Sequence, residues 1–241
     1  MPIEISDAPQ IAGAPAQADW KRLAAIIDHT LLKPETTSID VERLCREALE
    51  YGFACVMLHP TYIALAAALV AGTKMKIASV IGFPLGANTT SVKRYEALDA
   101  IRLGAREIDM VMNIGALKSG DRTRVEADMR GLVEVSHDNG AILKITVETA
   151  LLSLEEKILA CQLAAAAGAD YVKSSTGFSR GGAVAADISL MRGVVGNKIG
   201  VKASGGIRTL EDAQSMIDAG ANRIGTSAGI TIIEAARDRS T

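Results

Sequence analysis

Short apolar runs rich in valine and isoleucine alternate along the chain with longer segments whose apolar residues recur at helical spacing. Eight runs of this kind are present, at 26–31, 54–59, 76–82, 107–113, 142–149, 170–176, 200–204 and 223–227. Strands that alternate with helices form a parallel sheet covered by helices. Eight such units of about thirty residues each are typical of a closed (β/α)8 TIM barrel. An open doubly wound sheet would carry a GxGxxG turn, which this sequence lacks.

The segments between these runs give the clearest helical patterns at 38–48, 90–103, 124–139, 153–167 and 209–219. Ser38 is the predicted N-cap of the first, since a serine hydroxyl can accept from the free backbone N–H groups of a helix. Gly104, Gly168 and Gly220 each follow a helical segment, and glycine readily adopts the left-handed conformation that ends a helix. Residues 1–18 are proline-rich and predict a loose N-terminal arm, which leaves 19–241 as one barrel domain.

Composition excludes several classes of protein. The 241 residues are 49% hydrophobic but only 3% aromatic, and the net charge is −2. Such a chain has neither the basic field nor the rings that nucleic-acid binding needs. The longest apolar run, 63–71, is about half of a membrane span. The first twenty residues lack the basic and apolar regions of a signal peptide, so we expect a cytoplasmic protein with no membrane partner.

The three cysteines and three histidines show no spacing typical of a metal site or a disulfide framework. Cys45, Cys55 and Cys161 are widely separated, and we expect them to be buried, free thiols. No cofactor motif is present. We therefore expect chemistry that uses neither a metal nor a cofactor.

Charged residues interrupt five of the predicted strands: Asp28, Asp109, Lys144, Lys173 and Lys202. Barrel strands are buried on both faces, so charges within them are tolerable when opposite signs meet. In this fold the chemistry lies at the carboxyl ends of the strands. We expect the five side chains to converge there.

Lys173 is the candidate nucleophile. A lysine that is desolvated and close to a second cation is neutral near pH 7 and can attack a carbonyl to form a Schiff base. Lys202, at a similar height in the next strand, would be that cation. Asp109 is either a general acid–base or a salt-bridge partner of a lysine, and Lys173 itself could be a structural, paired lysine. Asp28 and Lys144 are expected to support the charge network.

Glycine-rich turns follow the last two predicted strands, and Thr176 and Gly177 follow the sixth. Backbone N–H groups exposed by glycine after the seventh and eighth strands form the usual phosphate site of such barrels. Tight turns favour glycine in any case, so each turn alone is a weak signal. The candidate phosphate-binding residues are Thr176, Gly177, Gly205, Gly206, Gly225 and Ser227.

Five segments together resemble deoxyribose-phosphate aldolase: IDHTLLKP (27–34), VIGFPLG (80–86), EIDMV (107–111), VKSSTGF (172–178) and VKASGGIRT (201–209). They occur in order on the predicted strands. The resemblance implies reversible cleavage of 2-deoxy-D-ribose 5-phosphate to D-glyceraldehyde 3-phosphate and acetaldehyde, without a metal. Lys173 matches the Schiff-base lysine, Lys202 the lysine that tunes it, and Asp109 the acid–base partner. The glycine turns and Ser227 match the phosphate loops, and a homodimer is the expected assembly.

Two features depart from that pattern. Phe178 stands where some members have lysine after the Ser-Thr-Gly turn, and the C-terminal segment has no tyrosine after Tyr171. Two other functions stay open at this stage. The chain could be a Schiff-base aldolase or transaldolase for another phosphosugar, or a phosphosugar-binding barrel without catalysis.

Overall fold

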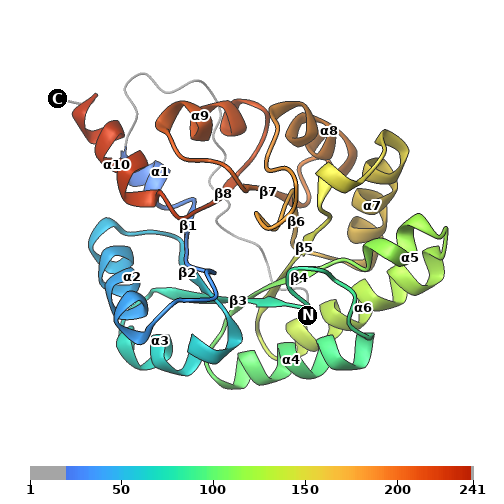
Figure 1. Cartoon of the computed structure of the whole chain (residues 1–241), viewed down its shortest axis with the longest axis horizontal. Coiled ribbons are helices and arrows are strands. Elements are labelled where there is room, and N and C mark those ends of the chain that lie inside the picture. The colour runs from blue at the N-terminus through green and yellow to red at the C-terminus, as the bar shows by residue number, and fades with distance from the viewer. Residues whose placement is uncertain (1–19, 240–241) are drawn as a thin grey trace.

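The computed structural model describes residues 20–239, and the predicted arm at 1–18 lies outside them. The strands are β1 (Ile27–Thr30), β2 (Cys55–Leu58), β3 (Lys76–Ile81), β4 (Glu107–Val111), β5 (Ile142–Thr146), β6 (Tyr171–Lys173), β7 (Gly200–Ser204) and β8 (Arg223–Thr226). They pair in parallel in chain order, and β8 pairs with β1 to close the barrel (Figure 1). The predicted (β/α)8 TIM barrel is confirmed.

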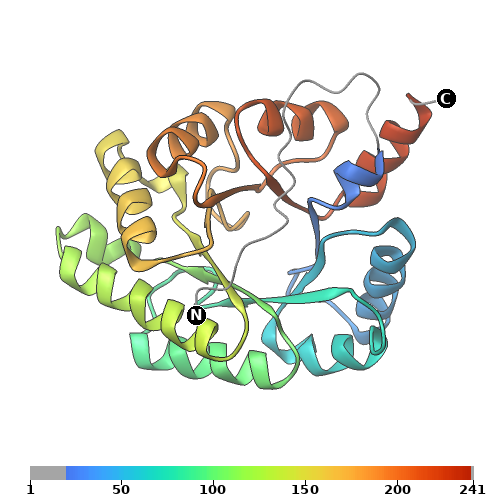
Figure 2. The ribbon, with the colours of Figure 1, turned by 180° about the vertical axis from the view of Figure 1, so that it is seen from behind.

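Helices surround the strands in both views (Figures 1 and 2). They are α1 (Trp20–Ala24), α2 (Ser38–Tyr51), α3 (Ile63–Leu69), α4 (Thr90–Arg102), α5 (Ile114–Lys118), α6 (Arg122–Asp138), α7 (Leu154–Ala167), α8 (Ala185–Val195), α9 (Leu210–Asp218) and α10 (Gly229–Asp238), with 3-10 turns η1 (Pro60–Tyr62) and η2 (Thr149–Leu151). The first helix, α1, packs against the last, α10. No helix among residues 20–239 is long and apolar enough to cross a membrane.

Side-chain caps fix where several helices start. Thr37, not the predicted Ser38, caps α2. Its hydroxyl accepts from the Asp40 backbone N–H, and the Asp40 carboxylate accepts from the Thr37 backbone N–H. Ser153 and Thr209 cap α7 and α9 in the same reciprocal manner. Gly168 ends α7 with φ of 89°, as predicted.

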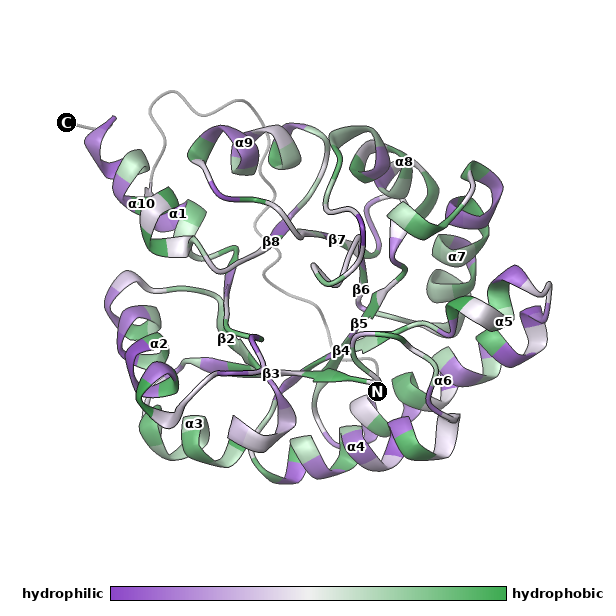
Figure 3. Ribbon diagram, viewed as in Figure 1, coloured by the Kyte–Doolittle hydropathy of each residue, from purple (hydrophilic) through white to green (hydrophobic). Residues whose placement is uncertain are grey.

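The strands have buried apolar residues on their outer side, where the helices pack. Figure 3 shows apolar strand segments that hydrophilic stretches interrupt. Inside the barrel, a small apolar cluster comes from one side: Leu32, Cys55, Met57, Ala78 and Val80, with Phe83 packed on it. Charged side chains meet on the other side of the interior. This division leaves the ionic half of the interior, on β1 and β4–β8, as the site for chemistry.

Candidate active site

Asp109 lies at the centre of the charged half of the barrel. Its Oδ1 accepts a hydrogen bond from Lys144 Nζ at 2.8 Å. Its Oδ2 accepts from Lys173 Nζ at 2.9 Å and from Lys202 Nζ at 2.7 Å. Asp28 accepts from Lys202 as well, and one of its oxygens lies 3.7 Å from Lys144 Nζ. The structure thus brings together all five of the charged residues predicted from the strands.

Strand register explains this convergence. Asp109 is the Cα partner of Lys144 between β4 and β5, and Lys173 is the partner of Lys202 between β6 and β7. Side chains at such paired positions lie side by side on the same face of a sheet. The prediction that Lys173 and Lys202 lie at the same height is therefore confirmed.

Two further charged residues belong to the network and were missed from the sequence. Arg223 donates to both oxygens of Glu107, at 3.0 and 2.8 Å, and also donates to Asp28. Glu107 lies 2.6 Å from Lys144 Nζ. The available signal was strand alternation, since Glu107 lies two residues before Asp109 and must point to the same face.

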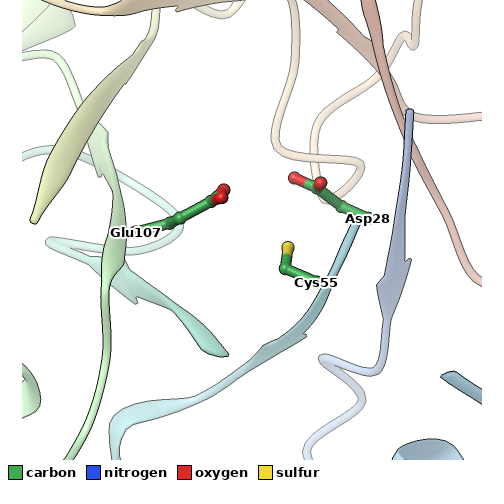
Figure 4. A group of neighbouring side chains, drawn as sticks. All are labelled: Asp28, Cys55 and Glu107. Atoms are coloured by element: carbon green, nitrogen blue, oxygen red, sulfur yellow. The ribbon is translucent and has the colours of Figure 1, made fainter. Parts of the chain in front are cut away.

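Asp28, Cys55 and Glu107 point toward one another from β1, β2 and β4 (Figure 4), with one possible ligand atom each within 4.8 Å of the others. Their chemistry suits an ion network better than a metal site. Both carboxylates already accept from Arg223, and Glu107 also contacts Lys144. Burial raises the pKa of the Cys55 thiol well above its usual value, so it is not a ready thiolate ligand.

The cations and carboxylates stabilise each other's charged forms. Burial alone would raise the pKa of Asp109, but Lys144, Lys173 and Lys202 outweigh it and hold that pKa well below its usual range. Burial would lower the pKa of Lys144, and Asp109 and Glu107 instead raise it well above 10.5. Both groups are therefore ionised at neutral pH.

Lys173 is the exception. Burial lowers its pKa from 10.5 to about 8; Asp109 opposes the shift and the neighbouring Lys202 adds to it. Lys173 is 3% exposed, and Asp109 is its one ion-pair partner among the described residues. It also ends β6, at the end of the barrel where such folds carry their chemistry. With a pKa of about 8, about a tenth of this amine is unprotonated at pH 7, and that fraction is available as a nucleophile.

The glycine turns after β6 and β7 approach each other closely. Gly177 and Gly205 have φ of 83° and 90°, and a Cβ on Gly205 would lie 3.4 Å from the Gly177 Cα. A side chain at Gly182 would overlap the Gly205 carbonyl oxygen. Gly177, Gly206 and Ser227 are exposed, so these turns face solvent at the mouth.

Two of the predicted phosphate residues have other contacts in the structure. The backbone N–H and hydroxyl of Thr176 both donate to Glu148 Oε2, at 3.0 and 2.5 Å. Gly225 lies within β8, and a Cβ there would lie 3.0 Å from Lys202 Cε. Gly225 thus makes room for the Lys202 side chain.

Aromatic side chains line another edge of the mouth. The Phe178 ring, half exposed, packs edge-on to Phe83 with 5.1 Å between ring centroids. Phe83 packs in turn against His59 at 5.8 Å. Phe178 is therefore part of an aromatic wall with Phe83 and His59.

A family model described as DeoC/LacD family aldolase matches residues 22–235. The chain belongs to this aldolase family. Two similar proteins, the deoxyribose-phosphate aldolases of Geobacillus sp. (strain WCH70) and Clostridium perfringens (strain 13 / Type A), are each 55% identical to it. The matches cover 88% and 90% of this chain, and 95% and 96% of those proteins.

A solved structure agrees with this assignment. The deoxyribose phosphate aldolase of Aeropyrum pernix, described as having a unique tetrameric structure, superimposes on the chain with a TM-score of 0.85 at 36% identity. The match covers 90% of this chain and 92% of that one. The chain is thus an aldolase, a carbon–carbon lyase.

Proposed function

We propose that the aldolase reversibly cleaves 2-deoxy-D-ribose 5-phosphate into D-glyceraldehyde 3-phosphate and acetaldehyde through a Schiff base on Lys173. The observation that carries this proposal is the Lys173 amine, buried beside Lys202 and Asp109 with its pKa lowered to about 8. The names of the 55% identical relatives support the choice of substrate.

The chemistry follows from the properties of an imine. The neutral Lys173 amine adds to the C1 aldehyde of the open-chain sugar to give a carbinolamine, which takes up one proton from the proton-transfer groups named below and loses water to leave a protonated imine. The bond between C2 and C3 then breaks as the C3 hydroxyl loses its proton. The electron pair of the C2–C3 bond forms a double bond between C1 and C2, and the imine nitrogen takes up the electrons of the C=N bond. Glyceraldehyde 3-phosphate leaves, and an enamine remains on Lys173. Protonation at C2 and hydrolysis of the imine release acetaldehyde and free Lys173.

Asp109 and Lys202 are the proposed proton-transfer groups for these steps. Asp109 contacts the Lys173 Nζ directly, and Lys202 contacts the same Asp109 oxygen. A proton leaving one site can therefore pass along hydrogen bonds that already exist. Asp28 and Lys144 support this arrangement by holding Lys202 and Asp109 in position.

The phosphate group is proposed to bind at the turns after β6, β7 and β8. Gly177, Gly206 and Ser227 are exposed there, and close packing at Gly205 brings two of the turns together. Thr176 and Gly225 shape this end of the site through Glu148 and Lys202. Phe178 offers no charge to the phosphate, so backbone N–H groups and Arg208 are the proposed donors.

Substrate preference tests the proposal. Purified enzyme should cleave 2-deoxy-D-ribose 5-phosphate with a kcat/KM at least about a hundredfold above the kcat/KM for cleavage of fructose phosphates. A preference for the fructose phosphates would favour the alternative of an aldolase or transaldolase for another phosphosugar. Binding of deoxyribose 5-phosphate without turnover would favour a non-catalytic barrel.

Assembly and location are also proposals. We propose that the enzyme is a homodimer. We also propose that it works in a reducing compartment such as the cytoplasm, because Cys45, Cys55 and Cys161 are all buried free thiols. Analytical ultracentrifugation should give about twice the 25.2 kDa mass of the chain. A tetramer, as described for the Aeropyrum pernix enzyme, would contradict the dimer.

A further inference from the structure

A second layer of charge crosses the barrel nearer the amino ends of the strands than the layer of Lys173 and Asp109. Its two residues, Glu107 and Arg223, are called the lower pair. Arg223 on β8 and Glu107 on β4 form a two-pronged ion pair across the interior, with Nη2 to oxygen distances of 3.0 and 2.8 Å. The Glu107 side chain is 1% exposed and that of Arg223 is 10% exposed. The chemistry proposed above uses neither residue.

Two chains of contacts connect this pair to Lys173. Arg223 donates to Asp28, Asp28 accepts from Lys202, and Lys202 donates to the Asp109 oxygen that also holds Lys173. The shorter chain passes from Glu107 to Lys144 at 2.6 Å and from Lys144 to Asp109 at 2.8 Å. The pair of Glu107 and Arg223 therefore contacts Lys144, which donates to Asp109, and Asp28, which accepts from Lys202.

Charge in the cluster is unbalanced. The cations are Lys144, Lys173, Lys202 and Arg223, and the carboxylates are Asp28, Glu107 and Asp109. The fully ionised cluster has one positive charge in excess, and an excess charge in a buried site is costly. Lys173, which contacts one carboxylate where the other cations contact two or three, is the group whose deprotonation removes the excess.

We propose that Glu107 and Arg223 are positioning residues that act through this network: their opposite charges set the share of Lys173 that carries a free amine. The inference rests on the proposed role of Lys173 as the Schiff-base lysine. Each charge change in the lower pair should move the titration of Lys173 in a direction fixed by its sign, because buried charges interact over several ångströms with little screening.

Other groups facing the cluster do not change this balance. Cys55 on β2 carries a thiol whose pKa burial raises, so it is uncharged. Lys76 on β3 lies 3.9 Å from Glu107 with its side chain 60% exposed, and solvent screens it. The Tyr171 ring on β6 lies against the Arg223 guanidinium at 6.0 Å. The charged and titratable strand residues at the cluster are Asp28 on β1, Cys55 on β2, Lys76 on β3, Glu107 and Asp109 on β4, Lys144 on β5, Tyr171 and Lys173 on β6, Lys202 on β7 and Arg223 on β8. His29, also on β1, instead contacts Glu47 of α2.

The test compares Glu107→Gln, Arg223→Met and the double variant that carries both changes. The readout is the pH midpoint for trapping acetaldehyde on Lys173 with cyanoborohydride, quantified by mass spectrometry of the labelled peptide. Glu107→Gln should lower the midpoint by about half a pH unit or more, and Arg223→Met should raise it by a similar amount. The double variant has the same charge excess as the parent and should return to within about 0.3 units of it.

Arg223→Lys provides a matched control, because it keeps the charge and should leave the midpoint within about 0.3 units of the parent. If Arg223→Met does not fold, the opposite signs are tested by Glu107→Gln against the double variant. A purely structural role would lower stability in both single variants without opposite shifts. Equal-sign shifts, unmoved midpoints, or a double variant that stays shifted would overturn the inference.

A second readout separates this inference from the proposed function. Carbamylation of Lys173 by cyanate also needs the free amine but needs no aldolase chemistry. If the parent enzyme fails to trap acetaldehyde on Lys173, the proposed function fails, and the carbamylation midpoints of the same variants still decide the role of Glu107 and Arg223.

Discussion

Each oxygen of the Asp109 carboxylate accepts from lysine, Oδ1 from Lys144 and Oδ2 from both Lys173 and Lys202. A carboxylate shared in this way gives Lys173 too little compensation for its burial, so its pKa falls to about 8. The sequence predicted these residues because each interrupts an apolar strand. It could not give the sharing of Asp109, since which oxygen meets which amine depends on barrel closure and register.

Replacement of Lys202 tests its role next to Lys173. Lys202→Leu removes one of the two cations beside Asp109 Oδ2 and should lower kcat at least about a hundredfold. Lys198→Leu, at an exposed lysine just before β7, is the matched control and should keep parental kcat. A steady-state assay with deoxyribose 5-phosphate measures both. Near-parental turnover in Lys202→Leu would remove Lys202 from the mechanism.

Gly225 provides a more local test of the same side chain. A Cβ in Gly225→Ala would lie 3.0 Å from both Lys202 Cε and Ser204 Cβ, which must move by a few tenths of an ångström. We expect kcat to fall by roughly tenfold as the Lys202 ammonium is displaced. Gly193→Ala in α8 is the control: its Cβ would meet no described atom within 4 Å, and the change should stabilise the fold by about 0.5–1 kcal/mol. Equal kcat in both variants would show that Gly225 does not position Lys202.

At the scale of elements, every predicted apolar run contains a strand, but most strands end before the run does. The run at 170–176 is an example: β6 ends at Lys173, and Ser174 to Thr176 stay buried as the chain turns into the mouth. Burial determines the pattern read from the sequence, and burial thus continues beyond the residues that pair as a strand. The helix α8 was not among the clear helical patterns, because Val184 at its start supplies no side-chain cap.

A buried ion pair outside the barrel holds two helices and a strand together. Lys93 of α4 donates to Asp128 of α6 at 2.6 Å and to the carbonyl of Val111, which ends β4, at 2.9 Å. Lys93→Met leaves the Asp128 charge without its cation, and we expect a loss of about 3–5 kcal/mol in the free energy of unfolding. Urea denaturation measures this loss.

The exposed pair Lys118–Glu156 offers a comparison for that variant. Its lysine side chain is 45% exposed, so Lys118→Met should cost less than about 1 kcal/mol. A loss in Lys93→Met as small as that in Lys118→Met would contradict the structural importance of the buried pair.

At the scale of the whole molecule, the barrel interior is divided into an apolar side and an ionic side. Leu32, Met57 and Val80 fill the former, and the network around Asp109 fills the latter. The sequence predicted the barrel and five members of the network, but not this division. Glu107 and Arg223 escaped notice because each stands first in its strand, where a charge is ordinary.

The predicted division of the chain into an arm and a barrel domain can be tested by truncation. The family model begins at residue 22, so a chain starting at residue 19 should keep parental kcat and an unfolding midpoint within about 2 °C. Thermal unfolding and the deoxyribose 5-phosphate assay measure the two quantities. A loss of folding or activity would show that residues 1–18 belong to the catalytic domain.

The central claim is that Lys173 forms the Schiff base. The enzyme should be incubated with acetaldehyde and reduced with borohydride across a pH series, and the modified residue located by peptide mass spectrometry. The account predicts one reduced adduct, on Lys173, whose yield rises with pH through a midpoint near the pKa of about 8, because only the unprotonated amine attacks. An adduct on Lys202 or Lys144 instead, or no adduct at any pH, would contradict it.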